Sequence, residues 1–391
     1  MYKITCELPA DREPWNISLS QRIKAVLSAV HEKRHVALMV YERADTSTFR
    51  YRCYNVYQTT NRGLWRSVYF FMNELDVVER LLEKCQLLIL TRVKWSYPLN
   101  NLVAKAKKSG ITVLFDVDDL VCNVQYLPLL TNTLNVHFGS EADYDFWFAY
   151  VARNEAAARL ADGFITTNQF LGEKLSQYFD KPYQIIMNSL NEEQLQISEL
   201  CRKKKKVQKS EGVFSIGYFS GTPSHINDFR VIYRELLQLL EDYPQMVLHV
   251  VGFMEFPNEL QSMLRDKRIT FTPLVDFMEL QRLIAQVDVN IVPLVNNVFT
   301  NCKSELKFFE AAAVDTVTIA TPTYTYEHAI QHGITGFLCR QGQWYDTIVE
   351  LYQRPELRQQ ISEDAETYCL NTYAGDLFRK QVCSAYSYFQ R

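Results

Sequence analysis

Two lysines and one glutamate lie close together in the stretch NCKSELKFFEAAA (301–313), whose apolar residues recur at helical spacing. Lys303, Lys307 and Glu310 are separated by four and three residues, so they share one face of the predicted helix. Both lysines lie near its start, where the helix macrodipole is positive and cations are unfavourable. The free N–H groups of such an end bind anions, and neighbouring lysines raise the positive potential. The pattern therefore predicts a diphosphate site, in which each charge-assisted hydrogen bond contributes about 1.5–3 kcal/mol.

The same stretch has a second interpretation. The two lysines are solvated, and Glu310 pairs with Lys307, which stabilises a helix by only about 0.2–0.5 kcal/mol. Asn301 or Ser304 is the expected N-cap in either case, because both side chains accept from free N–H groups. The spacing of the lysines alone leaves both interpretations open.

Charged residues also follow two strands predicted in the first half. LTRVKW places Arg92 and Lys94 after one strand, and FDVDDLV places Asp116, Asp118 and Asp119 at the end of the next. Three carboxylates at a strand terminus suit a divalent metal, and they suit the hydroxyl groups of an acceptor equally well. A role as N-cap of the following helix explains one carboxylate but not three.

The elements that would position these residues alternate along the chain. Short β-branched and aliphatic runs, separated by amphipathic segments, are typical of buried parallel strands with helices between them. The predicted strands of the first half are HVALMVYE (35–42), QLLILTR (86–92), ITVLFDVDD (111–119), DGFITTN (162–168) and YQIIMN (183–188). This alternation predicts a parallel sheet covered by helices on both faces.

A basic stretch, CRKKKKVQKSEG (201–212), interrupts the alternation and is interpreted as an exposed connector. The pattern then restarts with predicted strands FSIGYFSG (214–221), MVLHVVG (246–252), ITFTPLV (269–275), VNIVPLV (289–295) and TVTIATP (316–322). We therefore predict an α/β protein of two doubly wound, Rossmann-like domains facing across a cleft. The predicted domains are 1–205 and 210–372, and a C-terminal helix over 373–391 crosses back to the first. Ligands settle at the carboxyl ends of such strands.

The composition and charge of the chain argue against several classes of protein. The 391 residues are 47% hydrophobic and 22% charged, with a net charge of −3, so nothing global indicates nucleic-acid binding. No apolar run reaches the roughly 18–20 residues of a membrane span, and the N-terminus has no secretory h-region. Nine cysteines are scattered without metal-ligand or disulfide spacing, which favours free thiols and a cytoplasmic protein. No glycine-rich dinucleotide fingerprint follows either first strand.

Most of the chain, and most clearly its second half, resembles the retaining glycosyltransferases of the GT-B fold, family 4 (glycosyl transferases group 1). The resemblance rests on a strand ending in proline, a loop, the run EAAA (310–313), and the following VDTVTIATPTYTYEHAIQHGITGFLC. It implies transfer of a hexose from a nucleoside-diphosphate sugar to an acceptor hydroxyl with retention of configuration, in polysaccharide or glycoconjugate biosynthesis. It implies no metal and no cofactor besides the nucleotide-sugar substrate. Cys302 stands where the family has its first glutamate, so a catalytically idle nucleotide-sugar-binding relative, acting as a sensor or partner subunit, is the alternative.

The resemblance also implies roles for individual residues. Glu310 would accept hydrogen bonds from the ribose hydroxyls of the donor, while Lys303 and Lys307 stabilise the leaving diphosphate. The remaining donor-binding residues would be Ser220, Gly221, Thr222, Asn301 and Ser304. The turn at Ser220–Thr222 has an ordinary tight βα turn as its alternative.

The acceptor would bind to the first domain. The residues expected on that side are Arg50, Arg92, Lys94, Asp116, Asp118 and Asp119. The expected acceptor is a saccharide or a lipid-linked or protein-linked glycan. Arg50 or Arg52 would hold the phosphate of a lipid-linked one; a basic pair on the surface is the other interpretation of these two arginines. The basic run of the connector would attract the inner face of an anionic membrane by about 1 kcal/mol per cation; a solvated linker is the other interpretation.

Overall fold

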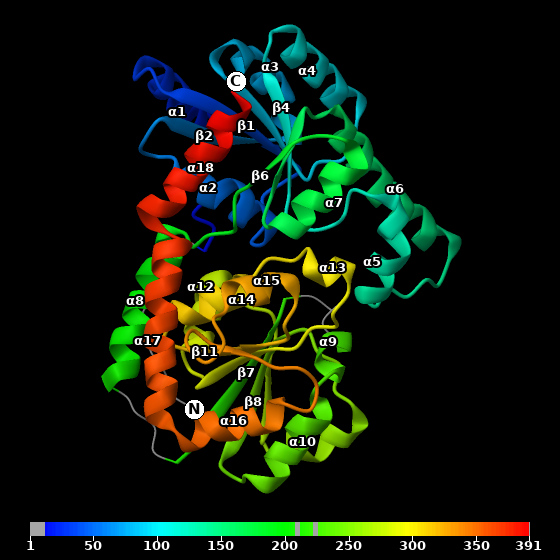
Figure 1. Ribbon diagram of the computed structural model, residues 1–391. Helices are drawn as coiled ribbons and strands as arrows, with labels where there is room; N and C mark the ends of the chain where they lie inside the picture. Colours follow the sequence, from blue (N-terminus) through cyan, green and yellow to red (C-terminus); the bar gives the residue numbers. More distant parts are fainter. Residues whose placement is uncertain (1–11, 208–211, 222–225, 391) are drawn as a thin grey trace.

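The computed structural model describes residues 12–207, 212–221 and 226–390, which form two α/β lobes stacked end to end (Figure 1). The first lobe contains one six-stranded sheet, ordered β2-β1-β3-β4-β5-β6, and all neighbouring strands are parallel. Its strands are β1 (His35–Tyr41), β2 (Trp65–Phe71), β3 (Leu87–Thr91), β4 (Thr112–Val117), β5 (Gly163–Thr166) and β6 (Tyr183–Ile185). The sequence pattern located five of these strands but missed β2, whose run WRSVYFF contains a charged residue.

The second lobe contains another six-stranded parallel sheet, ordered β12-β11-β10-β7-β8-β9. Its strands are β7 (Phe214–Ser220), β8 (Met246–Gly252), β9 (Ile269–Thr272), β10 (Val289–Val292), β11 (Val317–Ala320) and β12 (Phe337–Leu338). In each sheet the strand order reverses next to the lobe's first strand, between β1 and β3 and between β7 and β10. Ligands of doubly wound sheets bind at the carboxyl ends of the strands at such reversals.

Helices cover both faces of the first sheet, as the alternation predicts. They are α1 (Leu19–His31), α2 (Asn55–Thr59), α3 (Leu75–Leu81), α4 (Tyr97–Lys108), α5 (Leu127–Thr133), α6 (Glu141–Leu160) and α7 (Gln169–Phe179). The 3₁₀ turns are η2 (Met72–Glu74), η3 (Leu82–Lys84) and η4 (Val124–Tyr126), and η1 (Arg50–Tyr54) is a π-helix. Helix α4 shows why they form: Ser96 caps it by accepting from the Leu99 amide at 3.4 Å, and its apolar residues point to the sheet.

The second lobe follows the same plan. Its helices are α9 (Ile226–Arg230), α10 (Tyr233–Asp242), α11 (Gln261–Arg265), α12 (Phe277–Ile284), α13 (Val298–Asn301), α14 (Leu306–Ala312), α15 (Tyr324–Ala329), α16 (Trp344–Gln353) and α17 (Pro355–Thr372), with the 3₁₀ turn η6 (Asn258–Leu260). The helix predicted over 303–313 is therefore shorter than expected and is preceded by a separate short helix, α13.

Two crossings join the lobes. The chain passes from the first lobe to the second after β6 and returns between α17 and α18 (Gly375–Phe389), and the Leu190 amide donates to the Tyr373 carbonyl at 2.9 Å where the crossings meet. Figure 1 shows α18, in red, lying along the first lobe. There the ring of Tyr386 packs edge-on against Trp65, whose indole N–H donates to Ser387 Oγ at 3.1 Å.

Up to Val207, the basic stretch is part of a helix and not an exposed connector, so that prediction was wrong. It continues helix α8 (Glu192–Val207), which packs against the second lobe. Arg202 pairs with Glu366 at 2.8 Å, and the Lys205 ammonium donates to the Asp315 carbonyl at 2.7 Å. The cations are accommodated because the C-terminal carbonyls after α14 accept their hydrogen bonds. Lys209 lies outside the described residues.

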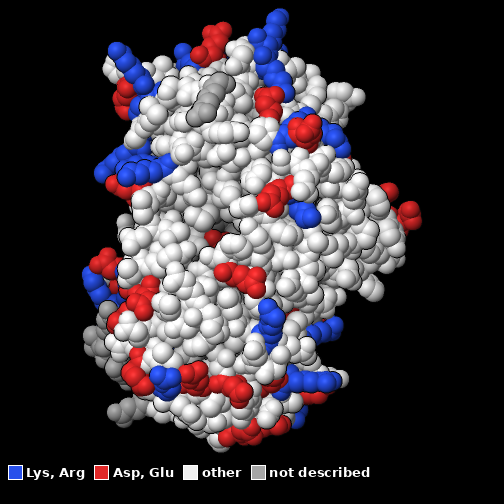
Figure 2. All heavy atoms as spheres, in the orientation of Figure 1, with Lys and Arg blue, Asp and Glu red and all other residues white. Residues whose placement is uncertain are grey.

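The surface carries no large field of one sign on the face seen in Figure 2, where basic and acidic side chains are interspersed. Among the described residues, no helix combines the length and the apolarity needed to cross a bilayer.

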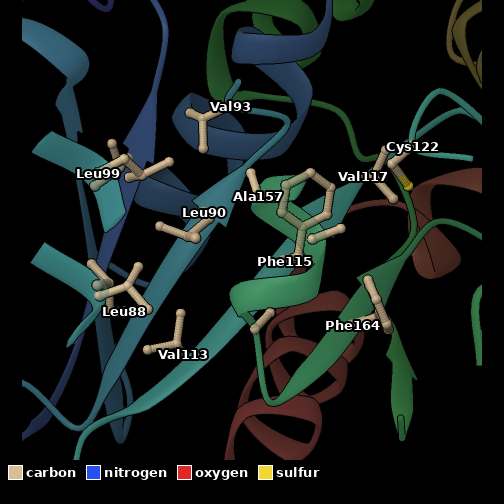
Figure 3. Packing of buried hydrophobic residues seen from close by; sticks show 14 of the residues in the cluster. Leu88, Leu90, Val93, Leu99, Val113, Phe115, Val117, Cys122, Ala157 and Phe164 are labelled. Atoms are coloured by element: carbon tan, nitrogen blue, oxygen red, sulfur yellow. The ribbon is translucent and has the colours of Figure 1, made fainter. Parts of the chain in front are cut away.

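The core of the first lobe lies between its sheet and the helices that cover it. Leu88, Leu90, Val113 and Phe115 come from adjacent strands and pack with their neighbours in Figure 3. The same cluster contains Phe299 and Cys302 of the second lobe. The lobes are thus joined by apolar packing close to Lys303, one of the residues predicted for the donor site.

Candidate functional site

The candidate site includes the point in the second sheet where the strand order reverses, between β7 and β10. Ser220, the last residue of β7, is buried, whereas a Cβ added to Gly221 would meet nothing within 4 Å. On the neighbouring strand, a Cβ on Gly252 (φ 108°) would lie 1.6 Å from the Ser220 carbonyl oxygen. Only glycine permits this approach of the two strand ends. Thr222, the third residue predicted for this turn, lies outside the described residues.

The loop that carries Lys303 is held from both lobes. Asn168, which caps α7 of the first lobe, donates its amide to the carbonyls of Cys302 at 3.0 Å and Lys303 at 3.2 Å. Thr325 Oγ1 donates to the same Lys303 carbonyl at 2.6 Å. The Cys302 side chain is buried in the core of the first lobe, so this position contributes a carbonyl partner and no side-chain group to the site.

Neither predicted N-cap performs that role, because both side chains have other partners. Asn301 Oδ1 accepts from the Tyr324 amide at 2.6 Å, and Ser304 Oγ accepts from the Asn188 amide at 2.8 Å. Glu305 occupies the N-cap position of α14 without a side-chain cap hydrogen bond. Lys303 therefore precedes the helix, and Lys307 lies in its first turn.

The two lysines remain unpaired. Among the described residues, neither Lys303 nor Lys307 forms an ion pair with a carboxylate. The Lys307 ammonium is half-buried, 5.6 Å from the centre of the Tyr218 ring. Burial lowers the pKa of Lys307 to about 8, with the attraction of Asp228 opposing the shift and Lys303 adding to it. Two neighbouring cations that form no salt bridge with a described residue favour an anionic ligand.

Glu310 lies where the lobes touch, rather than on an open helix face. Its Oε1 accepts from the hydroxyl of Tyr51 and from the side-chain amide of Gln194 at 3.1 Å. A guanidinium nitrogen of Arg50 lies 3.5 Å from the same oxygen. The carboxylate therefore joins a residue of the second lobe to the π-helix of the first lobe.

The first-lobe cluster is built around Arg92, which directly follows β3 with a left-handed backbone (φ 44°). Its guanidinium donates to Asp118 at 2.9 Å and approaches Asp119 at 3.5 Å. It also donates to Thr48 Oγ1 at 3.0 Å and to the Tyr150 hydroxyl at 3.0 Å. The arginine thus gathers side chains that follow β1, β3 and β4 at the reversal of the first sheet.

Asp119 links the two predicted sides of the site electrostatically. Burial and the negative charge of Asp118 raise the pKa of Asp119 to about 6, against the lowering effects of Arg92 and Lys303. The structure thereby brings together Arg92, Asp118 and Asp119 in the first lobe, and the charge of Lys303 acts on Asp119 from the second lobe.

Two other predicted acceptor-side residues have partners other than Arg92. Asp116 is held by Arg52 through two hydrogen bonds of 2.7 and 2.9 Å, so it does not share the arginine that binds Asp118 and Asp119. Burial raises the pKa of Asp116, and the attraction of Arg52 opposes this shift. The Lys94 ammonium lies 3.9 Å from Glu42 and over the Tyr150 ring at 6.0 Å.

A buried polar chain runs from Asp116 to the donor-side loop. Arg52 also donates to Asn188 Oδ1 at 3.2 Å, and the Asn188 amide donates to Ser304 Oγ. Sequence reasoning missed Asn188, although it is the last residue of the strand predicted over 183–188, where polar residues at a carboxyl end are a usable signal. It also missed Tyr51 and Gln194, which no sequence pattern distinguishes.

Comparisons with known proteins agree with this architecture. Residues 214–354 match the family model described as Glycosyl transferases group 1. No curated protein matches the chain in sequence. HepE from Anabaena, solved in complex with UDP, has a TM-score of 0.61 over 90% of this chain and 100% of its own, at 13% identity.

Two further solved structures are similar over nearly the whole chain. A glycosyltransferase from Rickettsia africae has a TM-score of 0.60 at 13% identity, covering 92% of this chain and 99% of its own. Sucrose-phosphate synthase from Thermosynechococcus elongatus has a TM-score of 0.58 at 12% identity, with coverages of 91% and 99%. The predicted fold class is confirmed: the two parallel sheets form a GT-B architecture, and the Glycosyl transferases group 1 model matches residues of its second lobe.

Proposed function

We propose that this protein is a retaining hexosyltransferase, which moves a sugar from a nucleoside-diphosphate sugar to a hydroxyl of a saccharide, lipid-linked or protein-linked glycan. The observation that carries the proposal is the pair Lys303 and Lys307, which form no salt bridge with any described residue and lie beside the strand reversal of a lobe that matches the Glycosyl transferases group 1 model. The GT-B neighbour HepE was solved with UDP and with UDP-glucose, which supports a nucleotide sugar as the donor.

The proposed chemistry divides between the lobes. Lys303 and Lys307 stabilise the negative charge that develops on the diphosphate as the glycosidic bond breaks. Asp118 and Asp119 accept from the acceptor hydroxyl groups, and Arg92 fixes the carboxylates. The attacking hydroxyl transfers its proton to a phosphate oxygen of the donor, on the face from which the nucleoside diphosphate departs. The new bond then has the configuration of the old one.

We further propose that the reaction needs no cofactor or metal, because two lysines neutralise the diphosphate. The setting is the cytoplasm, in polysaccharide or glycoconjugate synthesis. If the acceptor is lipid-linked, the protein would attach to the inner face of the membrane. Few cations of α8 are available for this attachment. Lys203 already pairs with Glu199, and both Arg202 and Lys205 bond to the second lobe.

Calorimetric titration with UDP, GDP, dTDP and ADP tests the nucleotide site. At least one should bind, and Lys307→Met should weaken that binding about 10- to 100-fold because a charge-assisted contact with phosphate is lost. Thermal stability should change little, since the Lys307 ammonium forms no salt bridge with the residues that the structure describes.

Lys205→Met is the matched control. Burial lowers the pKa of Lys205 to about 8 as well, but its ammonium is satisfied by protein oxygens, including Asp315 O at 2.7 Å and Thr316 Oγ1 at 2.9 Å. This variant should lose thermal stability and keep the nucleotide affinity. Equal nucleotide affinities for both variants, or no binding by any of the four nucleotides, would refute the site. Proton NMR of the anomeric signal of the product tests retention, and absence of turnover with nucleotide sugars would contradict the enzymatic assignment.

A further inference from the structure

The π-helix η1 divides its side chains between the two lobes. Its wide turn is closed by the Asn55 amide, which donates to the Arg50 carbonyl five residues earlier. Arg52 turns into the first lobe and binds Asp116, whereas Tyr51 reaches the second lobe and binds Glu310. Short π-helices occur frequently at functional sites. Here the widened turn allows neighbouring residues to serve different lobes.

The hydrogen bonds to Glu310 are asymmetric. Oε1 accepts from Tyr51 and Gln194 and lies near Arg50, while Oε2 accepts no hydrogen bond from the residues that the structure describes. The side chain is only 4% exposed, so its rotamer is restricted. Burial raises the pKa of Tyr51, which keeps the hydroxyl protonated and able to donate.

We propose that Tyr51 is a positioning residue for the nucleotide ribose: it holds Oε1 of Glu310 and leaves Oε2 to accept from a ribose hydroxyl. This inference rests on the proposed function. A carboxylate already fixed by one oxygen forms the ribose hydrogen bond without losing further side-chain freedom, which increases affinity. Tyr51 belongs to the first lobe and Glu310 to the second. Ribose recognition by the second lobe therefore depends on its contact with the first lobe.

Gln194 supports the same carboxylate but does not replace Tyr51. Its amide donates at 3.1 Å from the start of α8, directly after the chain crosses into the second lobe. A hydroxyl donor and an amide donor converging on Oε1 fix the carboxylate more firmly than either one alone. Loss of the Tyr51 hydroxyl should therefore loosen Glu310 without releasing it.

A purely structural role for Tyr51 makes a different prediction. If its hydroxyl only helps to join the lobes, Tyr51→Phe should weaken all nucleotides equally or not at all. If it positions Glu310, the loss should be confined to nucleotides that retain the ribose hydroxyl. Comparing a ribonucleotide with its deoxy analogue on the same variant cancels differences in the folded fraction.

The experiment measures dissociation constants of UDP, 2′-deoxy-UDP and 3′-deoxy-UDP, or the corresponding set for the nucleotide that the wild-type protein prefers. The wild-type protein should bind the ribonucleotide about tenfold more tightly than at least one deoxy analogue, as expected for one hydrogen bond to a charged group. Tyr51→Phe should reduce that preference at least threefold, and Glu310→Gln should reduce it further.

Tyr54→Phe is the matched control, because Tyr54 lies in the same π-helix and its hydroxyl donates to another carboxylate, Glu193, at 2.7 Å. It should keep the wild-type preference. An unchanged preference in Tyr51→Phe, or equal reductions in both tyrosine variants, would overturn the role of Tyr51 while leaving the proposed function intact. Failure of the wild-type protein to bind any nucleotide would overturn both.

Discussion

Near the strand ends, the cations of the first lobe form salt bridges with carboxylates, whereas Lys303 and Lys307 of the second lobe form none with the described residues. In the first lobe, Arg52 and Arg92 are each bonded to carboxylates at 2.7–2.9 Å. In the second lobe, Lys303 and Lys307 form no ion pair within the described residues, and Glu305 has one buried oxygen without a hydrogen-bond partner. Charges removed from water are costly unless they are paired. The paired cations therefore define a rigid frame, and the unpaired ones a site that a ligand completes.

Breaking the most buried pair should give the largest effect. Arg52→Met leaves Asp116 buried without its counter-charge, which we expect to lower the free energy of unfolding by about 3–5 kcal/mol. Urea denaturation followed by circular dichroism measures this change. The double variant Arg52→Met with Asp116→Leu should be more stable than Arg52→Met alone. A loss below about 1 kcal/mol in the single variant would show that the first lobe does not depend on this pair.

Glu305 is a buried carboxyl group of the second lobe, and its replacement should increase stability rather than lower it. Burial raises the pKa of Glu305 to about 7, so the folded state keeps the proton that the unfolded state releases near pH 4.3. The stability from this neutral carboxyl is present below pH 4.3 and is lost as the pH rises through about 7.

Replacing Glu305 by glutamine tests this cost directly. Glu305→Gln should stabilise the protein by about 2 kcal/mol at pH 8 and by little at pH 4, because glutamine reproduces the neutral form. Thermal denaturation at the two pH values provides the measurement. Equal changes at both pH values would mean that packing, rather than ionisation, determines the effect.

The smallest expected effect concerns the pH dependence of nucleotide binding. The pKa of Lys307 is lowered to about 8, and a bound diphosphate would raise it again. Affinity should be highest below pH 8 and fall as the lysine loses its proton, by up to about tenfold between pH 7 and pH 9. Lys307→Met should remove most of this dependence in calorimetric titrations. The same pH dependence in this variant would assign the titration to another group.

Hydrophobic periodicity was sufficient to predict the fold. Strands buried on both faces are continuous apolar runs, and ten of the twelve strands could be recognised from apolar runs without any contact information. β2 was missed because Arg66 interrupts its run, although its guanidinium donates to the Tyr57 carbonyl at 2.6 Å. The basic part of α8 was misjudged for a related reason: lysine and arginine become compatible with packing where backbone carbonyls accept their protons.

The site was only partly predictable, because its contacts join residues far apart in the chain. Strand ends showed where Arg92, Asp118 and Lys303 would lie, since parallel strands end at a common edge. No local pattern reveals that Arg52 donates hydrogen bonds to Asp116. Nor does any local pattern reveal that the Tyr51 hydroxyl donates to Glu310, which lies 259 positions later in the chain. Such partners depend on how the lobes pack, which the spacing of residues in one segment does not encode.

The return of α18 to the first lobe has a consequence for biosynthesis. Phe378, Val382, Tyr386 and Phe389 complete an apolar cluster, most of whose other members belong to the first lobe and are synthesised much earlier. During translation, part of the apolar surface of the first lobe therefore stays exposed until the second lobe and α18 have left the ribosome. Partly synthesised chains are therefore the species most exposed to aggregation and most dependent on chaperones.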